Sequence, residues 1–165
     1  MTNTNETMIY LNTWKAYNEG CEGYGWFNAS DAREFIEEDT ERDGGEWFIA
    51  DIDNYLGVSF SNLEYCNVMD VIDTIETLEE MDEWEREEVV ALMEYLTTED
   101  VQEAISQKDS YIFYEDTDAY FDSMDDLLDF GGCNEVLARY FDYDAYHRDL
   151  MFDAYEAGNG IVICG

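Results

Sequence analysis

The N-terminal third of the sequence alternates short apolar runs with polar, glycine-rich turns. Three runs are rich in aromatic and β-branched side chains, which is typical of strands, at residues 8–14, 24–28 and 46–52. Between the last two runs, Ser30 and Asp31 open a helical pattern that Gly44-Gly45 ends. We therefore expect residues 1–61 to form an α+β lobe with one antiparallel sheet, in the order β-β-α-β.

The middle of the chain places apolar residues at three- and four-residue spacing, which predicts amphipathic helices. Ser61-Asn-Leu-Glu64 has the spacing of a capping box, in which the serine oxygen accepts from an amide and the glutamate reaches back. Asp82-Glu-Trp-Glu85 offers a second cap, and a third, short helix is expected over residues 99–106. Residues 62–106 are thus predicted to form a central helical bundle.

The C-terminal third mixes both patterns. We expect a strand, two helices and a hairpin, at residues 111–114, 117–130, 134–140 and 151–164. Gly158-Asn-Gly160 supplies the residues of a tight hairpin turn. Residues 107–165 are therefore predicted to form a second α+β lobe, which makes the whole chain an α+β protein of three small lobes.

Charge changes this picture of an ordinary globular chain. The 165 residues contain 42 Asp and Glu against 7 Lys and Arg, a net charge of −35, although 46% of residues are hydrophobic and 16% are aromatic. The predicted lobes carry similar net charges, close to −10, −14 and −11 for residues 1–62, 63–103 and 104–165. A chain with so many aromatic residues builds a core, so we expect the acids on its surface. The four tryptophans, Trp14, Trp26, Trp47 and Trp84, are expected in that core.

Dense negative charge repels nucleic acids and anionic membranes, and it fits basic clefts. Duplex DNA carries one charge per about 1.7 Å of its axis, so one chain matches roughly 60 Å, or about 17 base pairs, of duplex. This charge suggests a DNA mimic whose partner is a DNA-binding protein. The expected DNA-mimic acidic surface comprises Asp70, Asp73, Glu76, Glu79, Glu80, Asp82, Glu83, Glu87, Glu88, Glu94, Asp122, Asp125 and Asp126.

The residues that usually carry catalysis or bind metals are sparse. Cys21, Cys66, Cys133 and Cys164 form no C-x-x-C pair, so we expect half-buried free thiols and neither a zinc site nor a cofactor. His147 is the single histidine, and it is expected at the surface or in an interface without a catalytic partner. The polar start lacks the features of a signal peptide, and no apolar run is long enough to cross a bilayer, which favours a soluble cytoplasmic protein.

Three other functions are consistent with an acidic chain. A calcium or magnesium binder is one, but Asp51-x-Asp53 and Asp116-x-Asp118 lack the glycine and the final glutamate of an EF-hand loop. A carboxylate-based hydrolase is another, although paired acids occur throughout this sequence by chance. Halophilic adaptation, in which acidity maintains solubility, is the third. A DNA mimic directed at a nucleoid protein or a repressor is the main alternative within the favoured class.

Two motifs resemble a known family. Tyr10-Leu-Asn-Thr-Trp-Lys-Ala-Tyr-Asn-Glu-Gly20, followed by Gly25-Trp-Phe27, is similar to the opening of the ArdA antirestriction proteins. Arg139-Tyr-Phe-Asp-Tyr-Asp-Ala-Tyr-His-Arg-Asp-Leu150 is similar to the C-terminal motif of that family. The last residues, Ile161-Val-Ile-Cys-Gly165, differ from the aromatic ending expected of it.

The resemblance implies a cytoplasmic DNA mimic, carried on mobile genetic elements, that occupies the DNA-binding groove of type I restriction–modification enzymes. It implies an elongated chain of three lobes that forms a homodimer through the C-terminal lobe, and no enzymatic activity. Arg139 and Arg148 are expected in internal salt bridges. The residues expected in the dimer interface or in a packed structural motif are Leu127, Leu128, Val136, Leu137, Tyr140, Phe141, Tyr143 and Tyr146.

Overall fold

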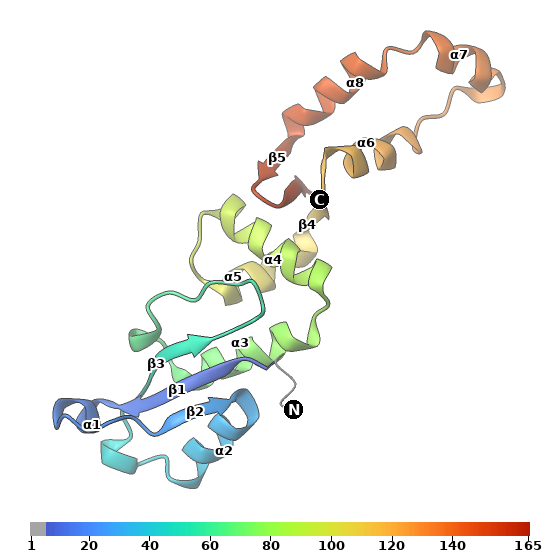
Figure 1. Ribbon diagram of the computed structural model, residues 1–165. Coiled ribbons are helices and arrows are strands. Elements are labelled where there is room, and N and C mark those ends of the chain that lie inside the picture. Colours follow the sequence, from blue (N-terminus) through green and yellow to red (C-terminus); the bar gives the residue numbers. More distant parts are fainter. Residues whose placement is uncertain (1–5) are drawn as a thin grey trace. The chain divides into compact units, whose positions relative to one another are not determined.

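The computed structural model describes residues 6–165, apart from the side chains of residues 133 and 134 (Figure 1). The chain forms two compact units. Unit 1 comprises residues 1–86 and 99–102, and unit 2 comprises residues 87–98 and 103–165. Both units contain helices and a small antiparallel sheet, so the predicted α+β class is confirmed. The boundaries of three lobes stay a prediction.

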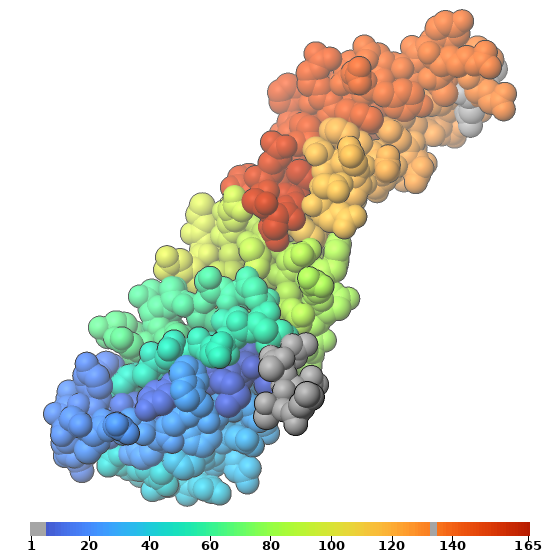
Figure 2. Space-filling view, in the orientation of Figure 1, coloured from blue at the N-terminus to red at the C-terminus, as the bar shows by residue number. Residues whose placement is uncertain are grey.

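Unit 1 is built on a three-stranded antiparallel sheet in the order β2-β1-β3. The strands are β1 (Met8–Thr13), β2 (Gly25–Asn28) and β3 (Trp47–Asp53), close to the three predicted runs. The register shifts between Tyr10 and Leu11, where β1 pairs with β3, so one residue of β3 is left over as a bulge. Atoms of β1 and β2 reach the surface of this unit (Figure 2).

The helices of unit 1 are α1 (Trp14–Asn18), α2 (Ala29–Glu38) and α3 (Val68–Glu80). Asn28 caps α2 and Asn67 caps α3, each by accepting backbone N–H groups of the first turn. The predicted capping box at Ser61 is wrong, because Asn62 adopts a left-handed φ of 53° and no α-helix continues through it. The core joins the sheet to α3 through side chains with no exposed surface: Ile9, Leu11, Ile49, Ile72, Ile75 and Leu78.

Two helices have residues in both units, α4 (Glu83–Leu96) and α5 (Val101–Gln107). Asp82 and Glu85 form the predicted capping box of α4, since Asp82 N donates to Glu85 Oε2 at 3.0 Å and Glu85 N donates to Asp82 Oδ1 at 2.8 Å. The expected helical character of this part of the chain is therefore confirmed. Short 3₁₀ turns lie at Arg42–Gly44, Leu63–Tyr65, Lys108–Ser110, Gly131–Cys133 and Met151–Asp153.

Unit 2 contains a second antiparallel sheet in the order β4-β6-β5. Its strands are β4 (Tyr111–Tyr114), β5 (Ala154–Ala157) and β6 (Gly160–Cys164), and its remaining helices are α6 (Thr117–Asp125), α7 (Asn134–Tyr140) and α8 (Tyr143–Leu150). The predicted strand and hairpin are confirmed. Strand β6, which contains most of the last residues that differ from the expected aromatic ending, is the central strand of this sheet.

Two helical predictions in unit 2 need correction. The helix expected over residues 117–130 ends at Asp125, because the chain turns there through hydrogen bonds from Leu127 N to Met124 O and from Leu128 N to Asp125 O. Helix α8 was not expected. Its N-cap is nevertheless a residue type that favours helix starts, Asp142, whose Oδ1 accepts from Ala145 N at 3.0 Å.

Candidate acidic surface

Helix α3 presents carboxylates because its other face is apolar. Val71, Ile72, Ile75 and Leu78 recur at helical spacing and are at most 7% exposed. On the opposite side of the helix, Asp70, Asp73 and Glu80 are exposed. Burial of one face therefore fixes the helix and with it the row of acids along the opposite face.

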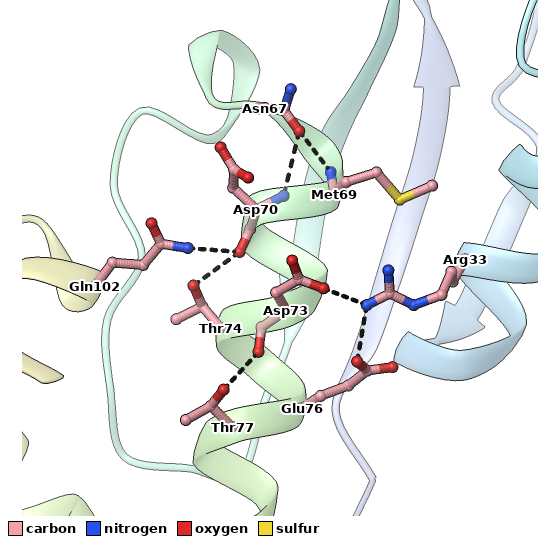
Figure 3. Close-up of polar contacts among 9 residues, drawn as sticks. All are labelled: Arg33, Asn67, Met69, Asp70, Asp73, Thr74, Glu76, Thr77 and Gln102. Carbon is pink, nitrogen blue, oxygen red and sulfur yellow. Dashed lines mark hydrogen bonds and ion pairs between the residues drawn. The ribbon is translucent and has the colours of Figure 1, made fainter. Parts of the chain in front are cut away.

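Arg33 of α2 connects two of these acids. Its Nη2 hydrogen-bonds Asp73 Oδ1 and lies 2.8 Å from Glu76 Oε2 (Figure 3). The hydrogen bond to Asp73 is the main reason that the pKa of Arg33 is raised, and the bond to Glu76 adds to it. No local sequence pattern indicates this contact, because it joins residues forty positions apart. Arg33 thus fixes the directions of two carboxylates and neutralises part of their charge.

The backbone of α3 is held at both ends of this row. Asn67 Oδ1 accepts from the N–H groups of Met69 at 2.9 Å and Asp70 at 3.2 Å, and Gln102 Nε2 donates to Asp70 O at 3.0 Å (Figure 3). At the other end, Arg86 donates to the carbonyl oxygens of Leu78 at 3.2 Å and Met81 at 2.7 Å. A cation there also complements the negative end of the helix dipole.

The other predicted acids of unit 1 differ in exposure. Asp82 and Glu83 are exposed. Glu76 and Glu79 are partly covered, and Glu79 Oε1 accepts from Thr7 N at 3.2 Å. The structure therefore brings five predicted acids together on α3 and places Asp82 and Glu83 just after that helix. Of the five, Asp70 and Glu80 are exposed, and their carboxylates make no hydrogen bond or ion pair within the described part of the chain.

In unit 2, four of the six predicted acids are exposed: Glu87, Glu94, Asp122 and Asp126. Glu94 also has a structural contact, because its Oε2 accepts from Gly158 N at 2.7 Å and so holds the turn between β5 and β6. Asn159 of the same turn donates to Glu87 O at 2.8 Å. These contacts position α4 against the hairpin within unit 2.

Glu88 does not belong to the exposed surface, and its prediction there is wrong. It is 5% exposed, and its Oε2 lies 3.6 Å from Lys108 Nζ. The physical reason is helical spacing, because Glu88 lies one turn before Leu92, which is fully buried. A buried carboxylate needs a nearby cation, and Lys108 supplies it.

Asp125 is also more than a surface acid. Its side chain is 27% exposed, and its Oδ1 lies 2.8 Å from His147 Nε2. The His147 ring stacks on Phe121, with centroids 4.2 Å apart and an angle of 5° between the planes. His147, expected at the surface or in an interface, is thus partly covered within unit 2, where α6 provides both an acid and a ring for it.

The C-terminal motif divides into covered and exposed residues. Phe141 packs against the rings of Phe130, Tyr143 and Tyr146, with centroids 4.9–5.5 Å apart. Leu128 is partly covered too. The exposed members of the motif, with their exposed fractions, are Leu127 at 73%, Val136 at 56%, Leu137 at 43% and Tyr140 at 84%. Half of the predicted motif thus packs inside unit 2, and half faces outward.

The expected internal salt bridges of Arg139 and Arg148 are not found among the described residues. Both side chains are exposed, and neither approaches a carboxylate closely enough to form an ion pair. Four other bases have internal contacts instead. Arg33, Arg86 and Lys108 make those given above, and Arg42 lies over the ring of Phe35, with Cζ 4.6 Å from its centroid.

The expectations for the tryptophans and for the cysteines are also wrong in part. Trp26 and Trp84 are 45% and 44% exposed, whereas Trp14 and Trp47 are partly covered, so the four tryptophans are not all in the core. Cys21, Cys66 and Cys164 are free but exposed, not half-buried. Cys133 lies outside the described side chains.

Within the described part of the chain, no group of three or more His, Cys, Asp or Glu side chains is arranged to hold a metal ion. Among residues 6–165, no helix combines the length and apolar character needed to cross a bilayer. What the two units offer is a set of fixed carboxylates on helices, with most of the few bases turned to internal contacts.

These features define an acidic α+β protein whose helices display carboxylates at the surface. The model of one protein family, described as antirestriction protein (ArdA), matches residues 9–162. The chain belongs to the ArdA family of antirestriction proteins. A comparison with curated proteins gave no match.

Proposed function

We propose that this chain inhibits type I restriction–modification enzymes by occupying their DNA-binding groove in place of duplex DNA. The observation that carries the proposal is the excess of 42 acids over 7 bases on a folded chain, together with carboxylates fixed on α3, α4 and α6. Such enzymes gain affinity for DNA by neutralising phosphates with Lys and Arg. A surface that presents carboxylates to the same cations competes with DNA.

The internal use of bases supports this mechanism. Arg33, Arg86 and Lys108 stabilise helices and buried acids, so they add few exposed positive charges that would weaken attraction to a basic groove. The surface presents no base edges, so inhibition is independent of the recognition sequence of the enzyme. Occupancy needs no covalent chemistry, and the proposed site of action is the cytoplasm.

We also propose that the protein acts as a homodimer through its C-terminal motif. The apolar side chains Leu127, Val136, Leu137 and Tyr140 support this, because each is at least 43% exposed and exposed apolar surface favours association. Sedimentation of wild type and Leu137→Asp tests it. The variant is expected to be monomeric at a concentration at which the wild type is dimeric. A monomeric wild type contradicts the proposal.

The inhibitory mechanism is tested with a purified type I enzyme and a labelled DNA duplex. The chain is expected to displace the duplex, with an affinity that falls steeply as salt rises, and equally well for duplexes with and without the recognition sequence. Binding that is independent of salt, or no binding, contradicts the proposal. Displacement of DNA from a nucleoid protein or a repressor, without any effect on the restriction enzyme, favours the alternative target.

Substitutions separate distributed charge from a single essential acid. The combined variant replaces six exposed acids by the corresponding amides. In the described part of the chain, the carboxylates of these acids make no hydrogen bond or ion pair: Asp70, Glu80, Glu83, Glu87, Asp122 and Asp126. We expect it to bind the enzyme roughly 10- to 100-fold more weakly, whereas Glu87→Gln alone changes binding by about twofold or less. If Glu87→Gln alone abolishes inhibition, charge is not distributed in the way proposed.

A further inference from the structure

One face of the sheet of unit 1 packs in the core, and part of the opposite face is exposed. Ile9, Leu11 and Ile49 point to the buried side and have no exposed surface. Successive residues of a strand point to opposite faces, so Tyr10 points the other way. Tyr10 pairs with Trp26 of β2 on one side and with Asp51 of β3 on the other. Residues directly opposite in neighbouring strands share a face, so these three side chains form a row across the sheet.

The aromatic pair in this row is held in place. The rings of Tyr10 and Trp26 meet edge to face, with centroids 5.3 Å apart and an angle of 70°. Tyr10 lies close over Gly23, where an added Cβ would collide with its ring and would lie 2.8 Å from Leu11 O. Trp26 nevertheless remains 45% exposed. An exposed indole with a fixed orientation does not lose much conformational freedom when a partner binds it.

Acids border the pair on β3. Asp51, opposite Tyr10, and Asp53, opposite Met8, are both exposed. Adjacent strands are about 4.8 Å apart, so the carboxylate of Asp51 lies within reach of a cation above Tyr10. The structure shows cation–π contacts at other rings, since Arg42 lies over Tyr24 and Phe35 and Arg86 lies over Tyr55. Tyr10 and Trp26 are thus available to a cation from outside.

We propose that Tyr10, Trp26 and Asp51 form a docking site for an arginine side chain of a basic protein partner. The guanidinium plane stacks on the aromatic pair, as planar cations do on exposed rings, and its N–H groups donate to Asp51. This inference rests on the proposed function, because the arginine belongs to the DNA-binding groove of the target enzyme. It adds a local anchor to a surface that otherwise acts through distributed charge.

The negative charge of the chain favours a basic protein as the partner over a nucleic acid or a second copy of the chain. Exposed aromatic rings also stack nucleobases, but a net charge of −35 repels a phosphate backbone. A second copy of the chain would bring the same acids against Asp51 and Asp53. A basic protein surface is attracted to both the rings and the carboxylates.

The first test compares three variants in binding to the type I enzyme. Trp26→Ala is expected to bind about tenfold more weakly, and Trp26→Phe, which keeps a ring, to lose much less. Tyr65→Ala is the matched control, because Tyr65 is an 83% exposed aromatic residue of the same unit. It is expected to bind as the wild type does. The loss in Trp26→Ala is expected to persist at high salt, whereas the loss in Asp51→Asn shrinks. Wild-type binding by a folded Trp26→Ala overturns the docking site.

The second test needs no restriction enzyme and separates the two proposals. A short arginine-rich peptide is titrated into the wild-type protein while the indole N–H resonances are followed by NMR. The Trp26 resonance is expected to shift and saturate, whereas those of the partly covered Trp14 and Trp47 move little. If the enzyme does not bind the wild type, the proposed function fails, and this titration still decides the docking site. An unshifted Trp26 resonance overturns it, even if the Trp26→Ala protein does not fold.

Self-association is the remaining outcome. Sedimentation that shows a dimer in the wild type and a monomer in Trp26→Ala, with equal peptide binding by both, overturns the assignment to a basic partner. It would place a second copy of the chain on Trp26 instead.

Discussion

Glu88 and Lys108 form an ion pair inside unit 2, with 3.6 Å between Oε2 and Nζ and side chains that are 7% and 21% exposed. The neighbouring Glu87 is exposed. Two adjacent glutamates of α4 therefore have different functions: one neutralises a partly buried lysine and the other contributes charge to the surface. This difference can be measured.

We expect Glu88→Gln to lower the free energy of unfolding of unit 2 by about 2 kcal/mol, because it removes the carboxylate beside a partly buried ammonium group. Glu87→Gln is the matched control, and it is expected to change stability by less than about 0.5 kcal/mol. Chemical denaturation followed by circular dichroism measures both. Equal stability of the two variants would contradict the buried ion pair.

Tyr24 and Asp43 give unit 1 a stability that depends on pH. The phenol of Tyr24 donates to Asp43 Oδ2, and Thr13 Oγ1 donates to the same oxygen at 3.1 Å. The bond from Tyr24 is the main reason that the pKa of Asp43 is lowered, and the bond to Asp43 is the main reason that the pKa of Tyr24 is raised. The pair is therefore most stable when Asp43 is ionised and Tyr24 is protonated.

These two pKa shifts determine how the stability lost in Tyr24→Phe depends on pH. The contribution of Asp43 is full above the ordinary aspartate pKa of about 3.9 and is lost as pH falls through its lowered value. The contribution of Tyr24 is full below the ordinary tyrosine pKa of about 10 and is lost as pH rises through its raised value. The stability difference between wild type and Tyr24→Phe should thus be largest near neutral pH. Unfolding midpoints of both proteins across pH measure it, and a constant difference would disprove the linkage.

His147 joins α6 to α8 through Asp125 and Phe121. We expect His147→Ala to destabilise unit 2 by about 1–2 kcal/mol, because it removes both the hydrogen bond and the ring stack. Arg148→Ala is the matched control in the same helix, since Arg148 is exposed and makes no ion pair with a described residue. It is expected to leave the unfolding midpoint unchanged. A larger loss in Arg148→Ala than in His147→Ala would show that the histidine is not the link.

Local patterns predicted the elements better than the contacts between them. The strands of unit 1 follow from runs of aromatic and β-branched residues, and α3 follows from apolar residues on one face. Glu88 could have been recognised as buried, because it lies four residues before Leu92 on the same helix face. Its partner Lys108 could not, since no local pattern indicates which lysine approaches it.

Long-range partners explain the remaining differences. Arg33 meets Asp73 and Glu76 only because α2 and α3 pack against the same sheet. The exposure of Trp26 depends on which face of the sheet the helices cover, and the alternation within β2 alone leaves both faces open. The sequence therefore predicts that the protein has an acidic surface, whereas the ion pairs and the exposed aromatic pair can be identified only from the folded structure.

The ending of the chain offers the last prediction. Strand β6 is central in the sheet of unit 2, and its first residue, Gly160, packs against β4. A Cβ atom at Gly160 would lie 2.5 Å from Tyr114 O and 2.6 Å from Phe113 Cζ. Gly158 is the matched control in the same turn, because a Cβ there meets only Glu94 Oε2, at 3.5 Å.

We expect Gly160→Ala to destabilise unit 2 by about 1–3 kcal/mol, because the backbone of β4 cannot move away without breaking its pairing with β6. Gly158→Ala is expected to stay within about 0.5 kcal/mol of the wild type. Thermal unfolding of the two variants compares these effects directly. If Gly160→Ala melts with the wild type, Gly160 does not pack against β4 as closely as described.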